Sequence, residues 1–462
     1  MPLLTTISGI RGTIGGRGAD CLNPQNAVSF TAAFAALLKA EFPETPLVVV
    51  VGRDGRISGP VLQDLVTATL RSMGVSVVDV GLSTTPSVEM AVPYHKAHGG
   101  IILTASHNPR EWNALKLLNA SGEFISSAAG KKLLEIAETG NFNFAGVMDL
   151  GQTSCDTESI QRHIASILAH PLVNKSAIAA AGFKIGLDAI NSTGALAVPA
   201  LLDALGVRLA HGINMDVTGD FAHNPEPLPA HLSQLSSLVS DNNLDLGISV
   251  DPDVDRLAFV CEDGTLFGEE YTLVAVADYV LSKRKGNTVS NLSSSRALRD
   301  VTIAHGGQYH ASAVGEVHVV ARMKETNAVI GGEGNGGVIL PDLHYGRDAL
   351  AGIALFLSLL AEKQLRLTEL RARYPQYEIV KEKIDLNPGM QLSSVLDSIK
   401  EAFKGDQMDE TDGVKIDFPE GWVHLRPSNT EPIIRVYAES TGIQEAKRLA
   451  NRVMTLVNGH TT

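Results

Sequence analysis

The chain has 462 residues, more than one hydrophobic core usually supports, so two to four domains are expected. Hydrophobic residues make up 44% and charged residues 19% of the chain, a composition typical of folded proteins rather than disordered ones. The formal net charge of −13 argues against a nucleic-acid partner, because such binding requires a basic surface.

The cysteines and the apolar segments predict the compartment. Cys21, Cys155 and Cys261 are far apart and form no CxxC pair, which indicates neither a disulfide framework nor a zinc site. The N-terminus has no signal-peptide pattern, and the longest apolar stretch, residues 353–361, is far short of the ~20 residues that cross a bilayer. We therefore expect a cytoplasmic monomer or homodimer without a membrane partner.

Short runs of Val, Ile and Leu alternate with longer amphipathic segments, which predicts parallel strands joined by crossover helices. The first third shows this order with strands expected at 47–51, 75–80 and 99–105 and a helix at 61–73. The order recurs twice, with strands expected at 183–188, 207–210 and 244–250, then at 288–292, 309–313 and 328–330. Helices are expected at 194–205 and 231–240 in the second copy.

The pattern changes after about residue 372, where strand-like runs and a closing helix at 443–457 predict a smaller α+β domain. Its strands are expected at 381–384, 414–417, 422–425 and 433–438. The predicted fold class is α/β, with three topologically similar domains of mixed, mainly parallel sheets and the smaller C-terminal domain, around a central cleft. The predicted domains are 1–153, 154–258, 259–372 and 373–462.

Each copy of the repeated unit ends on a polar motif. Ser106 follows the last predicted strand of the first copy, Asp251 that of the second, and the glycine-rich run 331–337 that of the third. Ligands of open α/β sheets bind outside the carboxyl ends of the strands. The three motifs are therefore expected to meet around one cleft.

Asp251, Asp253 and Asp255 alternate directly after a predicted strand. Two carboxylates ~4 Å apart repel by roughly 4 kcal/mol at an effective dielectric of 20, so converging carboxylates require a cation. Oxygen ligands favour Mg²⁺ or a similar hard ion. An EF-hand is a competing interpretation because Glu262 falls at its twelfth position, but Arg256 stands where that loop needs glycine. An exposed acidic turn is the other alternative.

Each remaining motif allows an ordinary structural interpretation as well as a functional one. The turn at 104–109 is common loop chemistry, and Ser106 is not set in a GxSxG elbow. The run 331–337 fits neither a P-loop nor a dinucleotide fingerprint, so it is either a flexible connection or a loop that binds sugar hydroxyls through Glu333 and Asn335.

The segment 426–435 concentrates donors that suit a phosphate group, although its middle also spells a helix capping box. These donors are Arg426, Ser428, Asn429, Thr430 and Arg435. In the first third of the chain, Arg53, Asp54 and Arg56 are expected to form ion pairs that fix loops rather than to touch substrate.

Together these motifs resemble the α-D-phosphohexomutase family, in order and across nearly the whole chain. The segments that carry the resemblance are 8–12, 52–59, 104–109, 251–256, 331–337 and 426–435. It implies a phosphohexomutase that converts hexose 6-phosphate to hexose 1-phosphate through an enzyme phosphoserine, Mg²⁺ and a hexose 1,6-bisphosphate. The implied catalytic residues are Ser106, Lys116, Arg11, His107 and Arg256, with Lys116 the candidate for proton transfer.

The resemblance also assigns the binding residues. Asp251, Asp253 and Asp255 would hold Mg²⁺ together with an oxygen of phosphorylated Ser106. Glu333 and Asn335 would bind sugar hydroxyls. The donors of segment 426–435 would grip the phosphate group that is not reacting.

Two departures from the family pattern bear on the substrate. Asn335 and Gly337 stand where many bacterial relatives have serine and histidine. The N-terminal motif reads Ser8-Gly9-Ile10-Arg11-Gly12 instead of the Thr-Asp-Gly-Ile-Arg-Gly form common in bacterial phosphoglucosamine mutases. A phosphoglucosamine mutase is the first expectation, with a phosphomannomutase or phosphoglucomutase as the alternative. A Mg²⁺-dependent phosphatase and a non-catalytic sugar-phosphate sensor are the remoter ones.

Overall fold

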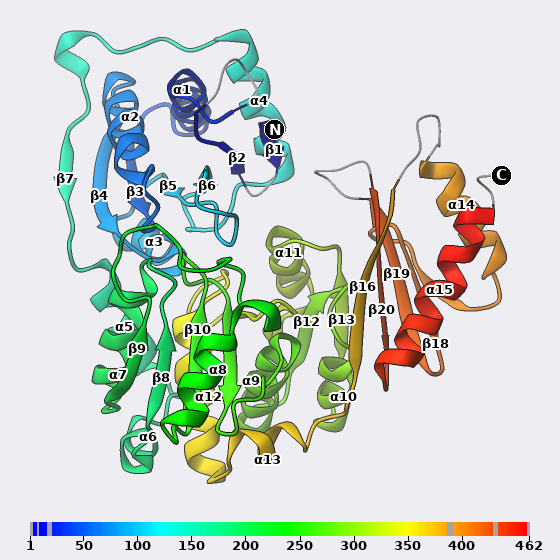
Figure 1. Cartoon of the computed structure of the whole chain (residues 1–462). Helices are drawn as coiled ribbons and strands as arrows, with labels where there is room; N and C mark the ends of the chain where they lie inside the picture. The colour runs from blue at the N-terminus through cyan, green and yellow to red at the C-terminus, as the bar shows by residue number, and fades with distance from the viewer. Residues whose placement is uncertain (1–2, 7–8, 16–20, 386–391, 428–432, 460–462) are drawn as a thin grey trace.

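The computed structural model describes residues 3–6, 9–15, 21–385, 392–427 and 433–459. Within these residues the chain builds four β-sheets, one after another along the sequence (Figure 1). The first three are mixed and mainly parallel with helices against them, and the fourth is antiparallel. The predicted α/β fold class is confirmed.

The first sheet has the order β1-β2-β6-β5-β3-β4-β7. Its strands are β1 (Leu4–Thr6), β2 (Gly9–Thr13), β3 (Val48–Arg53), β4 (Ser76–Leu82), β5 (Gly99–Leu103), β6 (Trp112–Leu118) and β7 (Thr153–Cys155). Apolar residues of α1 (Pro24–Glu41), α2 (Gly59–Ser72) and α4 (Ser127–Thr139) share one core with this sheet. Helix α3 (Thr85–Tyr94) belongs to a second core with residues of β3, β4 and β5.

The second sheet has the order β11-β10-β8-β9 and the third β13-β12-β14-β15. The second contains β8 (Ile185–Asp188), β9 (Leu209–Ile213), β10 (Leu246–Val250) and β11 (Leu257–Cys261), with α5 (Ser159–Ala169), α6 (Lys175–Ala181), α7 (Gly194–Ala204) and α8 (Ser233–Asp241). The third contains β12 (Asn287–Asn291), β13 (Tyr309–Ser312), β14 (Ala328–Glu333) and β15 (Gly337–Ile339), with α9 (Glu269–Lys283), α10 (Ala297–Ala304), α11 (Glu316–Thr326), α12 (Ala349–Lys363) and α13 (Leu367–Arg371). Short 3₁₀ turns occupy Val147–Asp149 and Pro229–His231.

Helix α12 carries the apolar stretch that the sequence singled out. Its residues from Ala349 to Leu360 are buried in a core that extends over the second and third sheets. Burial against two sheets accounts for an apolar surface all round the helix. Among the helices of the described residues, none is long and apolar enough to cross a membrane.

The three motif loops leave their sheets at equivalent places. In each sheet one central parallel strand is followed by an antiparallel neighbour, giving the pairs β5 with β6, β10 with β11 and β14 with β15. The motifs are the connections of these hairpins, at the carboxyl ends of the parallel strands. The equivalent strand orders confirm the predicted topological repeat, although the sequence did not predict the antiparallel strands.

The fourth sheet has the order β16-β20-β19-β18-β17 and is antiparallel throughout. Its strands are β16 (Glu378–Asp385), β17 (Gln407–Asp409), β18 (Val414–Phe418), β19 (Gly421–Pro427) and β20 (Ile433–Ser440), with α14 (Leu392–Ala402) and α15 (Ile443–Gly459) packed against them. Contacts with the third sheet's domain hold it in place, among them the Arg296–Asp417 ion pair at 2.9 Å.

Two details differ from the sequence prediction. The boundaries predicted at 153/154 and 258/259 fall inside β7 and β11, because a three-residue exposed strand and a hairpin partner give little signal in the sequence. The run 331–337 is not one loop. Strand β14 continues to Glu333 and β15 begins at Gly337, so the connection is only 334–336.

Candidate functional site

A cleft of about 340 Å³ lies where the motif loops meet. It is lined by residues from all four domains, and its volume falls in the range of small-molecule sites. The predicted site residues that line it are Arg11, Ser106, His107, Lys116, Arg256, Glu333, Asn335, Arg426 and Arg435. Ser428, Asn429 and Thr430 lie outside the described residues.

Ser106 occupies the turn that follows β5. Its Oγ donates a 2.7 Å hydrogen bond to Asp251 Oδ2, and its backbone N–H donates to Thr104 Oγ1 at 2.9 Å. The backbone φ of +49° places it in the left-handed region, which costs a residue with a side chain about 1 to 3 kcal/mol. The surrounding contacts must therefore hold this conformation.

Arg56 supplies those contacts. Its Nε pairs with Asp54 Oδ2 at 3.0 Å, and both side chains are fully buried. Its other nitrogens donate to the backbone carbonyls of Ser106, Asn108, Pro109 and Trp112. The predicted structural role of Arg56 and Asp54 is confirmed, whereas Arg53 donates to Gln63 Oε1 instead of joining that ion pair.

Replacing Arg56 with methionine is expected to lower the free energy of unfolding by about 3 kcal/mol, because Asp54 is left as a buried, unpaired carboxylate. The measurement is urea denaturation at neutral pH. Arg53→Met is the matched control from the same loop, with an expected loss below about 1 kcal/mol because Arg53 is less buried. Equal losses in the two variants would contradict the role of Arg56.

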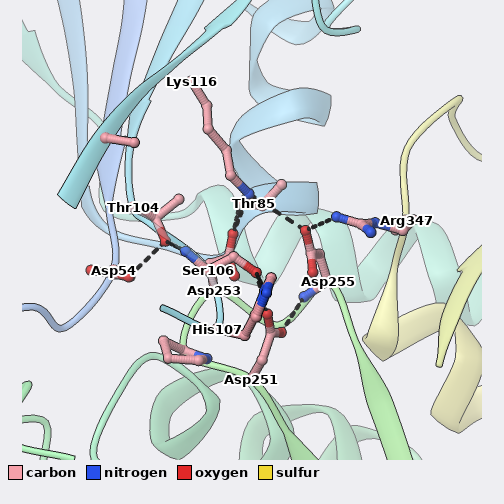
Figure 2. A network of polar contacts seen from close by, with 12 residues as sticks. Asp54, Thr85, Thr104, Ser106, His107, Lys116, Asp251, Asp253, Asp255 and Arg347 are labelled. Atoms are coloured by element: carbon pink, nitrogen blue, oxygen red, sulfur yellow. Dashed lines mark hydrogen bonds and ion pairs between the residues drawn. The ribbon is translucent and has the colours of Figure 1, made fainter. Parts of the chain in front are cut away.

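The three aspartates converge next to Ser106. Asp251, Asp253 and Asp255 are fully buried, and one carboxylate oxygen of each lies within 4.8 Å of the others (Figure 2). Burial, followed by the charges of Asp255 and Asp253, raises the pKa of Asp251 well above its ordinary value. Such a cluster is electrostatically incomplete without a cation.

The oxygens of the cluster divide into held and open ones. Asp253 Oδ2 accepts bonds from Thr85 Oγ1 at 2.6 Å and Lys116 Nζ at 2.7 Å, and Asp255 Oδ2 accepts from Arg347 Nη2 at 2.7 Å. The Oδ1 atoms of Asp253 and Asp255 are buried and have no hydrogen-bond partner among the described residues. Open carboxylate oxygens beside a hydroxyl fit a hard divalent cation such as Mg²⁺.

Positive side chains also line the cleft around Ser106. Arg11 Nη1 donates to Asn108 Oδ1 at 2.5 Å, and Arg256 Nη1 pairs with Glu226 Oε1 at 3.0 Å. Burial and the neighbouring Arg256 lower the pKa of Arg11 to about 10. The same causes lower the pKa of His107 well below its ordinary value, so its ring is neutral near pH 7. This arrangement suits an anion on Ser106.

Lys116 lies on β6 and reaches the aspartates from the first domain. Its Nζ is 2.7 Å from Asp253 Oδ2 and 3.4 Å from Asp255 Oδ2. Burial alone would lower the pKa of Lys116, but the two carboxylates outweigh burial and raise it. Lys116 is therefore a cation in this arrangement.

Glu333, the last residue of β14, lines the cleft from the third domain. Its Oε1 accepts from Asn291 Nδ2 at 2.8 Å and from the Gly315 N–H at 3.1 Å, while its Oε2 accepts from Arg347 Nη1 at 2.7 Å. Burial raises its pKa, but Arg347 and these bonds outweigh burial and lower it, so Glu333 is ionised. Asn335 lines the cleft beside it.

Two arginines face the cleft from the fourth domain. Arg426 on β19 and Arg435 on β20 are direct register partners on neighbouring strands. Like charges directly opposite each other destabilise a sheet. Arg426 Nε is buried and has no hydrogen-bond partner among the described residues, so an anionic ligand would both bind it and relieve the repulsion between the two arginines.

Sequence reasoning missed Arg347 and a buried polar cluster next to it. His344 Nε2 and His163 Nε2 lie 3.2 and 2.8 Å from Asp348 Oδ2, and His344 Nδ1 lies 3.3 Å from Glu89 Oε2. These residues come from three domains, so no local motif marks them. The only sequence signal was the concentration of charge and histidine at 344–348.

This cluster predicts a pH-dependent stability. Burial lowers the pKa of His344, but hydrogen bonds to Asp348 and Glu89 outweigh burial and raise it from 6.5 to about 10. The folded state then keeps a proton that the unfolded chain releases, so this stabilisation is complete below 6.5 and is lost as pH rises toward about 10. Urea midpoints of the wild type should fall more steeply across this window than those of His344→Gln. His231→Gln serves as the control, and parallel slopes for wild type and His344→Gln would contradict the assignment.

Comparison with known families identifies all four domains. The models described as phosphoglucomutase/phosphomannomutase alpha/beta/alpha domains I, II and III match residues 3–144, 161–264 and 268–377. The model of the C-terminal domain of the same family matches residues 368–456.

Full-length relatives carry two kinds of name. The chain is 34% identical to a phosphoglucomutase/phosphomannomutase of Thermococcus kodakarensis, covering 94% of this chain and 95% of that protein. It is 32% identical to a probable phosphoglucosamine mutase of Methanopyrus kandleri, covering 97% and 96%. Among solved structures, a phosphoglucomutase/phosphomannomutase family protein of Burkholderia thailandensis matches with a TM-score of 0.85 at 26% identity, covering 99% and 98%.

Proposed function

Because the chain belongs to the phosphoglucomutase/phosphomannomutase family and is a phosphohexomutase, we propose that it transfers a phosphoryl group between the 1- and 6-oxygens of a hexose through phosphorylated Ser106. The observation that carries this proposal is the 2.7 Å bond from Ser106 Oγ to Asp251 in the cleft that Arg426 and Arg435 also line. Ser106 and the two arginines thus line one cavity, and the buried aspartate cluster lies directly against Ser106.

Asp251, Asp253 and Asp255, with an oxygen of the phosphorylated Ser106, would hold Mg²⁺. Their burial and the open Oδ1 atoms support this assignment. When bound, Mg²⁺ would neutralise charge on the phosphoryl group during transfer. A phosphoserine adds a charge of about −1.5 to −2, so Arg11, Lys116 and Arg256 supply the further positive charge that the site needs.

In the transfer step, a sugar hydroxyl oxygen bonds to phosphorus while the bond from phosphorus to Ser106 Oγ breaks. Ser106 Oγ takes a proton as this bond breaks, and the proton of the sugar hydroxyl replaces it on the group that supplied it. Lys116, which is held as a cation, is assigned to the proton delivered to Oγ. Neutral His107, with Nδ1 3.4 Å from Ser106 Oγ, adds a hydrogen-bonding group there.

The product of this step is a hexose 1,6-bisphosphate. It must reorient in the cleft, so that its other phosphoryl group can be transferred to Ser106. Arg426 and Arg435, together with Ser428, Asn429 and Thr430, would grip the phosphate group that is not reacting. Glu333 and Asn335 would bind sugar hydroxyls in both orientations. Because one phosphate-binding site accepts either end of the sugar, both phosphoryl transfers can take place at the same Ser106.

We propose glucosamine phosphate as the preferred substrate, with mannose or glucose phosphate as the alternative. The name of the Methanopyrus kandleri relative supports the first and that of the Thermococcus kodakarensis relative supports the second. Coupled assays with the 6-phosphates of glucosamine, mannose and glucose should give the highest kcat/KM for glucosamine. A higher value for either other sugar would reverse this order.

A net charge of −13 argues against nucleic acid as the partner, whereas the basic residues that line the cleft support a hexose phosphate. We further propose a cytoplasmic location and a monomer or homodimer. Light scattering of the purified chain would test the assembly, and a larger oligomer would contradict it.

The decisive experiment is the intact mass of the purified protein, combined with peptide mapping. Incubation with glucose 1,6-bisphosphate should add one phosphate group, located on Ser106. A protein that cannot be phosphorylated there would refute the mechanism.

A further inference from the structure

Arg347 lines the cleft and bonds to both Asp255 and Glu333, but it belongs to none of the motifs predicted from the sequence. It lies in the connection before α12 and is only 9% exposed. Its Nη2 bonds to Asp255 Oδ2 at 2.7 Å, its Nη1 bonds to Glu333 Oε2 at 2.7 Å, and its Nε lies 3.0 Å from Glu316 Oε2. One guanidinium therefore joins three buried carboxylates.

The two short bonds connect loops of different sheets. Asp255 belongs to the hairpin connection of the second sheet, and Glu333 ends β14 of the third. Figure 2 shows Arg347 pointing at Asp255 from the side opposite Lys116. The planar guanidinium presents its nitrogens in fixed directions, so it sets the position of one carboxylate relative to the other.

Arg347 holds one oxygen of each carboxylate and leaves the other to a different task. Asp255 Oδ1 has no hydrogen-bond partner among the described residues and is the atom open to a cation. Glu333 Oε1 is oriented by Asn291 and the Gly315 N–H. A shift of the guanidinium would therefore disturb both the cation cradle and the sugar side.

Gly337 provides the room that this arrangement requires. A Cβ built at this position would lie 2.4 Å from Arg347 Cδ and 3.0 Å from its Cγ. Because the guanidinium is tied to three carboxylates, the arginine side chain has little freedom to withdraw. The glycine at the start of β15 thus allows Arg347 to reach Asp255.

We propose that Arg347 is a positioning residue that couples the three aspartates to Glu333. The ion pair between Glu333 and Arg347 then sets the affinity of the Asp255 carboxylate for Mg²⁺. This inference rests on the proposed function, which supplies the cation and the sugar. Coupling between two sites is reciprocal, so Mg²⁺ in the cradle also orders Glu333 for the sugar. Arg347 has no hydrogen bond to Ser106 among the described residues and acts through its carboxylate partners.

A double-mutant cycle read out by Mg²⁺ binding tests the coupling without any sugar. Glu333→Gln is expected to weaken Mg²⁺ binding about fivefold, because the guanidinium keeps its charge but loses one of the carboxylates that place and neutralise it. In an Arg347→Lys background, the same change should alter the affinity less than about twofold, because an ammonium group cannot bridge both carboxylates. The affinity is measured by isothermal titration of the unphosphorylated protein with MgCl₂.

Glu226→Gln is the matched control. Glu226 also lines the cleft and also pairs with an arginine, but that partner is Arg256. Its effect on Mg²⁺ binding should be the same with and without Arg347→Lys. Equal effects of Glu333→Gln in the two backgrounds would overturn the coupling.

A second variant covers the case in which Arg347→Lys fails to fold. Glu333→Asp keeps the charge but shortens the reach to Arg347, and it should weaken Mg²⁺ binding about as much as Glu333→Gln does. Unchanged affinity would overturn the proposal. Wild-type protein that binds no Mg²⁺ would overturn the proposed cradle as well, whereas additive effects in the cycle would overturn the coupling alone.

Discussion

Replacing Ser106 with alanine is expected to lower kcat/KM for hexose phosphate interconversion by more than about 10⁴-fold, because the chain then has no oxygen to carry the phosphoryl group. The aspartate cluster should persist, since Lys116, Thr85 and Arg347 still hold Asp253 and Asp255, and two backbone N–H groups still hold Asp251. The measurement is a coupled assay of the purified variant, with and without added glucose 1,6-bisphosphate.

Ser126→Ala is the control for this variant. Ser126 caps the N-terminus of α4, where its hydroxyl accepts the Ala129 N–H at 3.2 Å. Its loss should cost about 1 kcal/mol of stability and leave turnover unchanged. The phosphatase alternative makes the opposite prediction for Ser106, namely that Ser106→Ala still turns over and releases inorganic phosphate faster than it isomerises the sugar. That result would end the phosphoserine mechanism.

Removal of the divalent cation is expected to have the second-largest effect. Dialysis against EDTA should lower the rate by about 10³-fold or more, because several kcal/mol of charge stabilisation is lost in the transition state. Addition of MgCl₂ should restore the rate. Activity that is insensitive to chelation would contradict the assignment of the three aspartates.

Asp253→Asn tests the same assignment within the chain. The substitution keeps the size of the side chain but removes the charge of the carboxylate whose Oδ1 is open. Activity should fall by about 10²-fold or more at saturating sugar phosphate, with partial recovery at high Mg²⁺. Asp263→Asn is the control, since Asp263 is an exposed turn residue whose carboxylate, within the described part of the chain, accepts bonds only from Thr265 of its own hairpin. Equal losses of activity in the two variants would show that the loss in Asp253→Asn does not come from cation binding.

The sequence predicted the central strands well because they are buried on both sides. The strand expected at 244–250 is β10 (Leu246–Val250), and the strand expected at 99–105 is β5 (Gly99–Leu103), both with every residue buried. In an alternating α/β pattern, continuous apolar runs of this length are typical of buried parallel strands and too short for helices. Since ligand loops follow such strands, the shared cleft could be predicted as well.

The antiparallel strands could not be predicted in the same way. Strand β6 (Trp112–Leu118) contains Asn113 and Lys116 among its apolar residues, so it does not appear as a continuous apolar run. Its position depends on pairing with β5 and β2, and such pairing is not visible in local sequence. Lys116 was therefore expected to be near the site only through the family resemblance.

Arg347 illustrates the limit for side chains. Its partners Asp255 and Glu333 are 92 and 14 residues away in the chain, and the bond to Asp255 requires two domains to pack together. A single arginine in a loop is ordinarily exposed. Only the packed structure distinguishes this buried arginine from a solvated one.

The equivalent position of the three hairpin connections places Ser106, the three aspartates and Asn335 on three different sheets. With sugar binding assigned to the connection 334–336 as proposed above, substitutions there would change the sugar preference while Ser106 and the three aspartates stay the same. Relatives named for glucose and mannose phosphates or for glucosamine phosphate both align over nearly the whole of this chain. On this architecture, changing the substrate needs replacement of a few residues at one strand end rather than a new catalytic apparatus.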